Sequence, residues 1–344
     1  MSIATASTSA KTAEPTPTTT NAANAAETTT PSKQYLKLTG LILGLSTILL
    51  LMLLSFVTPL LNSGAKDLPL AVGGPDMVTT KITQGLEAKS PDAFAVTSYS
   101  TAEEAVDAVQ NREAIGAITA GPDGITIVTA SAAGTPYSAI LKQIGEGLSQ
   151  TGQPIHYTDV APLTAKDPSG SAISMLALPM IFGGMSSAVA FSTVFKKSRR
   201  KQIIGAIGVA ILGGLIASAT LYFGFGAFEA NFWLTTAVIM LGIAAISLTV
   251  LGLNSLLGFA GIGLGAVLML FVANPLSGLA TGAAWLPSPW GTLGQYLPLG
   301  AAGTAIRSSA FFDGAAMGQP VTVLVCWIVA GIGLAAAGAW RARR

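Results

Sequence analysis

The sequence is poor in the residue types that most enzymes use for chemistry. Its 344 residues contain a single histidine, His156, and a single cysteine, Cys326. An intrachain disulfide or a zinc site needs several such residues, and a serine–histidine–aspartate site lacks a spare partner. The phosphate-binding pattern GxxxxGK[ST] is also missing. We therefore predict no catalytic, cofactor-binding or metal site and no enzyme activity, with His156 solvated on a strand and Cys326 a small apolar filler.

Charged residues are also scarce. They make up 10% of the chain, whereas a soluble domain carries roughly 25%. The stretches without any charge are 38–65, 168–195, 202–228, 230–306 and 314–340. This distribution excludes a single soluble globule. The net charge of +2 and the lack of a basic face on a folded module exclude nucleic acid as a partner.

The uncharged stretches predict a polytopic α-helical membrane protein. Each is longer than the roughly 20 apolar residues that a helix needs to cross about 30 Å of hydrocarbon, and the longest holds two spans. We predict six transmembrane helices, at about 38–60, 174–195, 202–223, 231–251, 255–273 and 320–340. Residues 1–34 predict a disordered cytoplasmic leader, followed by transmembrane helix 1 at 35–61 and helices 2 to 6 within 173–344.

Basic residues set the expected orientation in the membrane. Lys33 and Lys37 precede the first span, and Arg341, Arg343 and Arg344 follow the last. The turn between the second and third spans, here called the basic turn, contains Lys196, Lys197, Arg199, Arg200 and Lys201. With six spans these clusters share one side, which the positive-inside rule makes cytoplasmic. We expect a multi-pass protein of the plasma (inner) membrane, with the basic turn serving as a topology or partner contact.

Residues 62–172 predict one soluble domain, on the extracytoplasmic side. Strands are expected at 68–74, 93–100, 114–120, 125–131 and 154–160. Helices follow from the apolar spacing of Val78, Ile82 and Leu86 and from that in 103–110 and 137–148, the second with a capping box from Ser100 or Thr101 to Glu103 or Glu104. The order βαβαββαβ predicts a small α/β domain with a mixed sheet. Its short tethers suit a gate, a cap or a docking surface, and no convergent polar cluster is visible.

The segment at about 275–319 is the most unusual part of the chain. Prolines interrupt it, and a weakly amphipathic stretch covers about 299–312, so we predict a re-entrant or interfacial element. The candidate contacts to substrate or lipid are Arg307, Asp313, Glu229, Trp290 and Tyr296. Arg307 has two interpretations, as a partner of an anionic headgroup or substrate and as a snorkelling anchor. Glu229 is expected at the outer interface among aromatic residues, and Asp313 beyond a helix end.

Four sequence features together resemble a known family. They are LPLAVGGPD at 68–76, TAEEAVDAVQNREAIGAIT at 101–119, DPSG at 167–170 and SPWGTLGQYLPLGAAGTAIRSSAFF at 288–312. With the long domain after the first span, they resemble the phage-infection-protein (YhgE/Pip-like) branch of the type-2 ABC transporter membrane proteins, over residues 36–340. The resemblance implies a permease subunit that exports a hydrophobic or amphipathic compound, or a cell-envelope component, energised by a separate ATPase. It also implies a homo- or hetero-dimer in contact with membrane lipid.

A second hypothesis follows from the small expected cytoplasmic surface. The residues before the first span are too few for an amphipathic helix, the basic turn is short, and spans four and five join near 252–254 without a loop. A non-transporting accessory or scaffold subunit of a larger cell-envelope or membrane-enzyme complex fits this surface, acting through its extracytoplasmic domain. A membrane enzyme that uses Glu229, Arg307 and Asp313 on a lipid is a third hypothesis, disfavoured because three scattered charges make a poor site.

Overall fold

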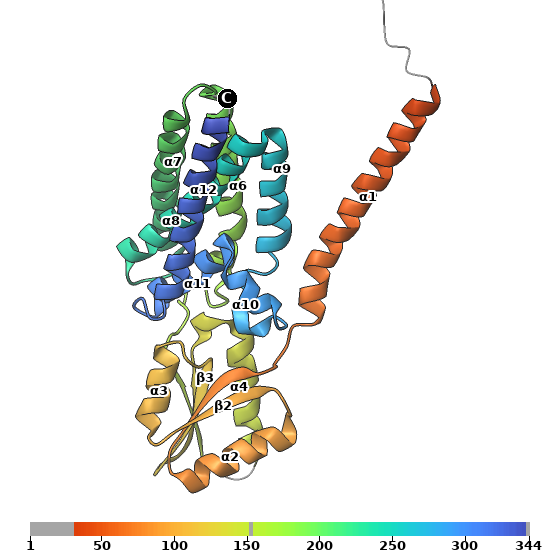
Figure 1. Ribbon diagram of the computed structural model, residues 1–344. Coiled ribbons are helices and arrows are strands. Elements are labelled where there is room, and N and C mark those ends of the chain that lie inside the picture. The colour runs from red at the N-terminus through yellow and green to blue at the C-terminus, as the bar shows by residue number, and fades with distance from the viewer. Residues whose placement is uncertain (1–30, 151–153, 342–344) are drawn as a thin grey trace, which may run out of the picture. The chain divides into compact units, whose positions relative to one another are not determined.

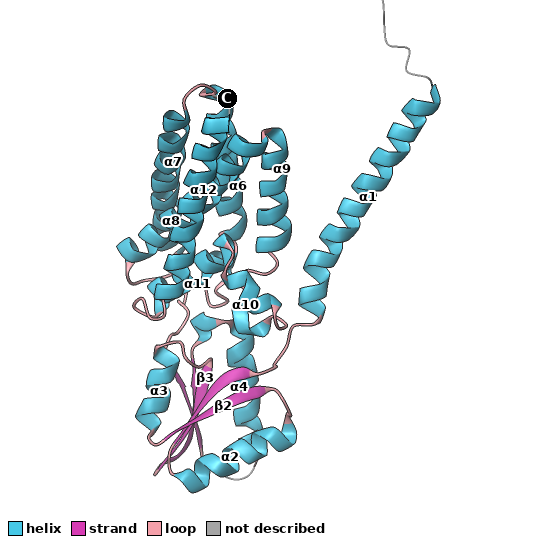
Figure 2. Cartoon of the chain, in the orientation of Figure 1, coloured by secondary structure: helices cyan, strands magenta, loops and turns pink. Residues whose placement is uncertain are grey.

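The computed structural model describes residues 31–150 and 154–341, with side chains from residue 34 onward. The chain divides into two compact units, Met1–Leu51 and Met52–Arg344. The predicted leader, apart from its last few residues, and the basic residues Arg343 and Arg344 lie outside the described part. Figure 2 distinguishes the helical and sheet-containing regions of the fold.

The first half of the chain contains one long helix and then all the strands. Its elements are α1 (Pro31–Leu61), β1 (Leu68–Gly73), α2 (Asp76–Lys89), β2 (Phe94–Tyr99), α3 (Ala102–Gln110), β3 (Gly116–Gly121), β4 (Gly124–Thr129), the 3₁₀-helix η1 (Ser131–Ala133), α4 (Thr135–Ser149) and β5 (Ile155–Asp159). This order is the predicted βαβαββαβ. The predicted strands and helices of the α/β domain are therefore confirmed.

The second half is helical. Its elements are α5 (Ser171–Ser174), α6 (Ala177–Val194), α7 (Arg199–Ala219), the π-helical η2 (Thr220–Phe225), α8 (Phe232–Leu257), α9 (Phe259–Ala266), the π-helical η3 (Val267–Ala273), the 3₁₀-helix η4 (Ala283–Trp285), α10 (Trp290–Gln295), α11 (Pro298–Phe311) and α12 (Gly318–Arg341). Figure 1 shows α6, α7, α8 and α12 running alongside one another.

Long apolar helices confirm the coarse prediction of a polytopic membrane protein with a small α/β domain. In the described part of the chain, five helices are long and apolar enough to cross a membrane: Gln34–Leu61, Ser171–Val194, Arg199–Phe225, Phe232–Leu257 and Gly318–Arg341. They coincide with five of the predicted spans. The number of spans and their orientation in the membrane stay predictions.

The predicted span at 255–273 is shorter in the structure. It forms the apolar helix Phe259–Ala273, and at 1.5 Å per residue a helix of this length covers only about 22 Å. The preceding helix α8 continues to Leu257 and ends at Gly258, whose φ of 63° lies in the left-handed region that glycine adopts at little cost. The sequence placed this break near 252–254, but Gly252 lies inside α8 and packs on α12.

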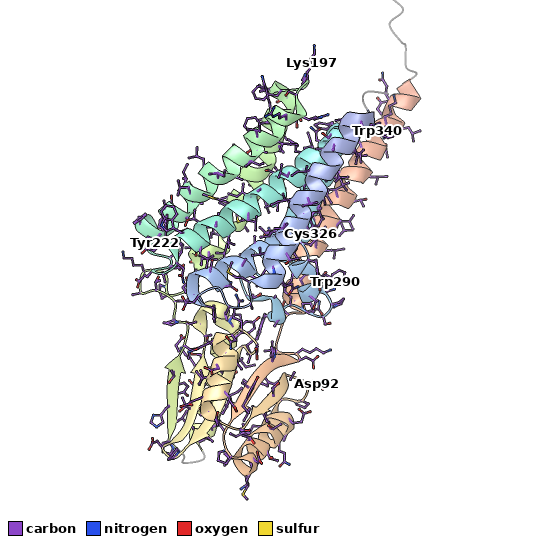
Figure 3. The ribbon with its side chains drawn as sticks, turned by 60° about the vertical axis from the view of Figure 1, so that its left-hand side comes forward. Asp92, Lys197, Tyr222, Trp290, Cys326 and Trp340 are labelled. Carbon is purple, nitrogen blue, oxygen red and sulfur yellow. The ribbon has the colours of Figure 1, made fainter. Side chains whose placement is uncertain are left out.

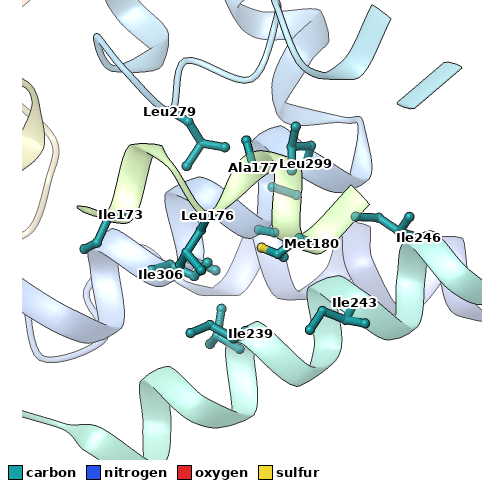
Figure 4. Packing of buried hydrophobic residues seen from close by; sticks show 14 of the residues in the cluster. Ile173, Leu176, Ala177, Met180, Ile239, Ile243, Ile246, Leu279, Leu299 and Ile306 are labelled. Atoms are coloured by element: carbon teal, nitrogen blue, oxygen red, sulfur yellow. The ribbon is translucent and has the colours of Figure 1, made fainter. Parts of the chain in front are cut away.

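Helix α8 forms the centre of the bundle. Its most apolar stretch of 18 residues is 72% buried, and α6, α7, α11 and α12 all contact the helix. Figure 4 shows Ile239, Ile243 and Ile246 of α8 facing Met180 of α6 and Ile306 of α11 in one hydrophobic cluster. A helix that is apolar around its whole circumference belongs either in a protein core or in a membrane span, and protein neighbours cover most of α8.

Glycines allow α8 and α12 to approach closely. A Cβ atom on Gly252 would lie 2.4 Å from the carbonyl oxygen of Gly331, and one on Gly331 would lie 2.5 Å from that of Leu248. The small-residue pattern at 261–265 also serves packing within the bundle, because a Cβ on Gly261 would lie 2.1 Å from the carbonyl oxygen of Leu253. Small residues at such contacts bring helix backbones together in the absence of a hydrophobic driving force.

The α/β domain has three layers. Its sheet has the order β2-β1-β3-β4-β5, in which only the β3–β4 pair is antiparallel. Residues such as Leu70 and Ile118 pack on one face with α2 and α4, whereas Ala71 and Ala117 pack on the other with α3. The smaller side chains on the α3 face let that helix lie close to the sheet. Thr101 and Glu104 form the predicted capping box at its start.

Helix α11 shows how the middle of the segment at 275–319 is built, whereas its re-entrant or interfacial placement in a membrane stays a prediction. The segment is broken into short helices, as its prolines indicated. The stretch at 299–312 does not have one buried and one exposed face, as an amphipathic helix would. From Pro298 to Ala310 every residue of α11 except Thr304 is buried. Its many Gly, Ala and Ser residues allow neighbouring backbones to approach from several sides. The helix therefore lies in the interior of the protein. It is placed between α8 on one side and, on the other, η1, which comes just before α4 of the α/β domain.

Candidate functional site

The α/β domain and α11 enclose a cavity of about 200 Å³, here called the arginine cavity. Arg112 of the α/β domain and Arg307 of α11 line it, together with Tyr137, Gln295 and Thr304. The two arginines are the only charged residues in its described lining. No acidic side chain among the described residues faces them there, so the cavity has a purely positive formal charge.

Arg112 reaches the cavity from the end of α3. Its backbone has a φ of 63°, a left-handed conformation that costs a residue with a Cβ about 1–2 kcal/mol. Its Nη1 donates hydrogen bonds to the carbonyl oxygen of Thr304 at 3.0 Å and to Oγ of Ser308 at 2.7 Å. Its Cζ lies 4.9 Å from the centre of the Phe312 ring. These contacts to α11 and the residue after it hold the side chain in place despite the backbone cost.

Arg307 meets the domain from the opposite side and is only 5% exposed. Its Nη1 donates to the carbonyl oxygen of Ala132 in η1 at 2.7 Å, and its Nη2 donates to that of Leu279. The snorkelling interpretation is therefore wrong, because that role requires an exposed guanidinium. The anionic-partner interpretation stays a prediction, now at a buried position.

The electrostatics of the cavity favour positive charge and a protonated phenol. Burial, together with the positive charge of Arg307, lowers the pKa of Arg112 to about 10, which leaves it charged at neutral pH. Burial raises the pKa of Tyr137 to about 12. The Tyr137 hydroxyl accepts a hydrogen bond from the Trp285 amide at 3.2 Å. Its own proton remains available for an acceptor in the cavity.

A second hollow, here called the apolar groove, lies between α6 and α7. It has a volume of about 650 Å³ and is lined by Lys166, Asp167, Ser171, Ala172, Met175, Leu176, Pro179, Gly213, Ile216, Ala217, Thr220, Leu221 and Phe225. Most of these side chains are apolar. Lys166 and Asp167 place charge at one end, where the chain enters α5. The groove therefore combines a long apolar wall with a charged end.

The charged end of the groove is structurally defined. Asp167 is buried, and its carboxylate accepts hydrogen bonds from the backbone amides of Ser171 at 3.0 Å and Ala172 at 2.9 Å. These amides begin α5, so the carboxylate caps a helix start rather than facing a ligand. Lys166 is exposed and is the cation left free to meet a bound molecule.

The other predicted contact residues do not join Arg307. Glu229 is exposed, and its carbonyl oxygen accepts a hydrogen bond from the Tyr222 hydroxyl at 3.2 Å. Asp313 lies beyond the end of α11, as predicted, and accepts a hydrogen bond from Nδ2 of Asn231 at 2.7 Å. Glu229 stands next to an aromatic cluster that contains Tyr222, Phe223, Phe228, Phe232 and Trp233. Its placement at the outer interface stays a prediction, and its side chain is exposed in the structure.

Trp290 and Tyr296 flank α10 and are 47% and 55% exposed. Their side chains are thus free to meet lipid or a partner. The carbonyl oxygen of Tyr296 accepts a hydrogen bond from Nε1 of Trp327 in α12 at 2.8 Å. In Figure 3, Trp290 lies at the end of the bundle that is next to the α/β domain.

The basic turn lies at the opposite end of the bundle. Figure 3 shows Lys197 there, at the same end as Trp340 near the end of α12. Ser198 caps α7, and the buried Gln202 donates to the carbonyl oxygen of Phe195 at 2.9 Å while accepting from Arg199 at 2.8 Å. The exposed members of the turn are Lys196, Lys197, Arg200 and Lys201. These hydrogen bonds hold the backbone of the turn, and its cationic side chains point outward.

In the described part of the chain, neither of the two rare residues belongs to a cluster of metal-ligating side chains. His156 is exposed on β5, as predicted, with its Nε2 at 3.3 Å from the carbonyl oxygen of Asp123. Cys326 is exposed on the surface of α12, so it does not fill an internal gap as predicted. Within residues 31–150 and 154–341, no group of three or more His, Cys, Asp or Glu side chains could hold a metal ion.

Sequence reasoning did not find the arginine cavity. Arg112 and Arg307 are far apart in the chain, and Arg112 follows a helix that shows no local sign of a binding role. The left-handed backbone of Arg112 would have been a signal, but it is visible only in the structure. Comparison of the chain with protein-family models, curated proteins and solved structures finds no match.

Proposed function

We propose that the chain is a membrane permease subunit that moves a hydrophobic or amphipathic compound, or a cell-envelope component, out of the cell. The apolar groove is the observation on which this proposal rests. Its volume of about 650 Å³ lies within the range of small-molecule sites, roughly 300–1,000 Å³. An amphipathic molecule would place its apolar part along α6 and α7 and its polar end near Lys166.

The position of the groove beside the π-helical segment η2 supports the proposal. Its wall includes Thr220 and Phe225 of η2, the π-helical end of α7. Single π-helical turns within helices often occur at functional sites, because they loosen the regular hydrogen-bonding pattern. Thr164, in the connection from the α/β domain, donates a hydrogen bond to the carbonyl oxygen of Gly226 directly after η2, at 2.7 Å. A rearrangement of the groove would therefore reach the domain.

The energy source in this proposal is a separate ATPase, because the sequence has no phosphate-binding loop. The basic turn is the surface that we assign to this partner. Lys196, Lys197 and Arg200 are exposed, so an acidic partner surface can reach them. This assignment agrees with the cytoplasmic location that the positive-inside rule predicts for the turn.

The proposal is tested by transport measured in inside-out membrane vesicles. Vesicles with the chain should accumulate a fluorescent long-chain amphiphile when ATP is added, and vesicles without it should not. Gly213→Phe should abolish this uptake, because Gly213 lines the groove and has only one nearby atom, Cδ1 of Ile243 at 3.7 Å. Gly208→Phe is the matched control on the same helix, where nothing lies within 4 Å. Equal uptake by the two variants would contradict the role of the groove.

The accessory-subunit alternative keeps one structural argument. Among residues 31–150 and 154–341, and apart from helix ends, the end of the bundle that carries the basic turn offers an ATPase that turn and the Gly258 break. Affinity purification in mild detergent separates the two functions. Recovery of an ATPase that is lost in Lys197→Glu but not in Lys142→Glu, a control in the α/β domain, supports the permease. Recovery of an envelope synthase without an ATPase, together with no ATP-dependent uptake, supports the accessory role.

A further inference from the structure

The arginine cavity has an uncompensated charge that the proposed transport function does not explain. Arg112 and Arg307 line it, and its described lining contains no Asp or Glu. Removing a cation from water costs several kcal/mol in a protein even after relaxation, unless an opposite charge is placed beside it. Carbonyl and hydroxyl oxygens offset part of this cost for both arginines. They do not balance the net charge.

Both guanidinium groups also keep hydrogen-bond donors for another partner. Each guanidinium has five N–H groups. The described hydrogen bonds of Arg112 use only Nη1, and those of Arg307 use one bond each from Nη1 and Nη2. Nε of both residues and Nη2 of Arg112 have no acceptor among the described residues. Among the described residues, these nitrogens are not buried against protein atoms, so their N–H groups are open to an acceptor that enters the cavity.

Other groups around the cavity favour the same kind of partner. Tyr137 is 3% exposed, and its hydroxyl proton has no described acceptor. Gln319 and Pro320, in the first turn of the long helix α12, also line the cavity. The N-terminal end of a helix carries a partial positive charge and free amide groups, which attract anions. Positive charge, free donors and a helix start thus meet in one place.

We propose that the arginine cavity binds a phosphate group with two ionisable oxygens, carried either by inorganic phosphate or by the phosphomonoester headgroup of phosphatidic acid. A phosphate of nearly two negative charges balances both arginines, whereas a single carboxylate would leave one unmatched. The planar fork of arginine also matches the oxygens of phosphate in pairs. The volume of about 200 Å³ exceeds the roughly 30 Å³ share of one water molecule several-fold.

A bound phosphate would join two parts of the protein. Arg112 belongs to the α/β domain, and Arg307 belongs to α11 in the bundle. Because both would contact the same anion, its binding would stabilise the docking of the domain on α11. The free energy of this stabilisation would grow with the logarithm of the phosphate concentration once that concentration exceeds Kd. This inference stands on the cavity alone and holds whether the chain is a permease or an accessory subunit.

The test uses the full chain, purified in mild detergent and stripped of lipid. Its thermal unfolding midpoint is measured during a titration with inorganic phosphate, with sodium chloride keeping the ionic strength constant. In a parallel series, micelles contain phosphatidic acid or diacylglycerol, which lacks the phosphate. We expect a saturable rise of the midpoint with inorganic phosphate, with phosphatidic acid, or with both, and none with diacylglycerol.

Variants locate the binding. Gln319 is exposed at the rim of the cavity, so Gln319→Glu should leave the fold intact while adding a carboxylate that competes for the arginines. It should raise the apparent Kd by roughly tenfold or more, and Gln319→Ala is the control that should not. Arg112→Gln should abolish the response.

Some outcomes identify the source of the phosphate, and others overturn the proposal. A response to inorganic phosphate that Gln319→Glu weakens assigns the site to the free ion, and a response to phosphatidic acid alone assigns it to a lipid headgroup. No response to either probe overturns the proposal. A response that Gln319→Glu leaves unchanged also overturns it, and this variant decides the question if Arg112→Gln does not fold.

Discussion

Replacing Gly331 with valine tests the packing that holds the helix bundle together. A Cβ atom at this position would lie 2.5 Å from both the carbonyl carbon and the carbonyl oxygen of Leu248, and 2.8 Å from the amide nitrogen of Thr249. These are backbone atoms, so no side chain can rotate away and α12 has to move outward from α8. A gap of 0.5–1 Å forfeits a quarter to a half of each van der Waals contact along the seam.

The expected cost is at the upper end of the usual range for overpacking, about 3 kcal/mol, because valine adds a branched side chain against backbone. At about 2–4 °C per kcal/mol for a chain of a few hundred residues, the unfolding midpoint should fall by about 6–12 °C. The assay is thermal unfolding in detergent, followed by tryptophan fluorescence and by the loss of the monodisperse peak in gel filtration.

Gly333→Val is the matched control, on the same helix and with nothing within 4 Å of its Cβ position. Substitutions at such open sites usually change stability by less than about 0.5 kcal/mol. Gly331→Ala should fall between the two, since it introduces the clash without the branch. If Gly331→Val and Gly333→Val unfold at the same temperature, the close approach of α8 and α12 described above is wrong.

Three further predictions concern the α/β domain and the orientation of the chain. Thr101→Ala removes the capping box and should lower the free energy of unfolding by about 1 kcal/mol in denaturant titrations, whereas Thr80→Ala, which loses only a bond to its own helix backbone, should cost less. Because burial raises the pKa of Tyr137 to about 12 and an unfolded tyrosine ionises near pH 10, its contribution to stability should be intact below pH 10 and decline from there to pH 12. Tyr137→Phe should remove the last tyrosinate absorbance step, and an unchanged titration would refute this. In a Cys326→Ser background, a membrane-impermeant maleimide should label Met77→Cys in intact cells but Lys197→Cys only after permeabilisation; the reverse pattern would invert the topology.

Local patterns in the sequence were sufficient to predict the α/β domain. Alternation in 93–100 and 125–131, the helical spacing of apolar residues and the Thr101–Glu104 cap are short-range signals, and each corresponds to an element of the structure. The long apolar helices followed from run length for the same reason. These features depend on residues that are close in sequence, so tertiary contacts had little chance to override them.

The parts that the sequence did not predict depend on contacts between distant residues. Gly252 looked like a helix end because glycine often ends helices, but a facing Gly331 explains it better. For Arg307 the sequence left two interpretations open, a surface anchor and a contact to an anionic group, and it could not show that the side chain is buried. Its partners, the carbonyls of Ala132 and Leu279, become visible only when the domain is placed on α11. The arginine cavity follows from the same placement.

The central position of α8 has a consequence for biosynthesis. Its neighbours α6 and α7 leave the ribosome before it, whereas α11 and α12 leave after it. While α12 is still inside the ribosomal tunnel, the face of α8 that carries Gly252 has no neighbour and lies open to lipid. The completed bundle therefore depends on α12, because a nascent protein that stops before Gly318 would leave this face of α8 without its partner.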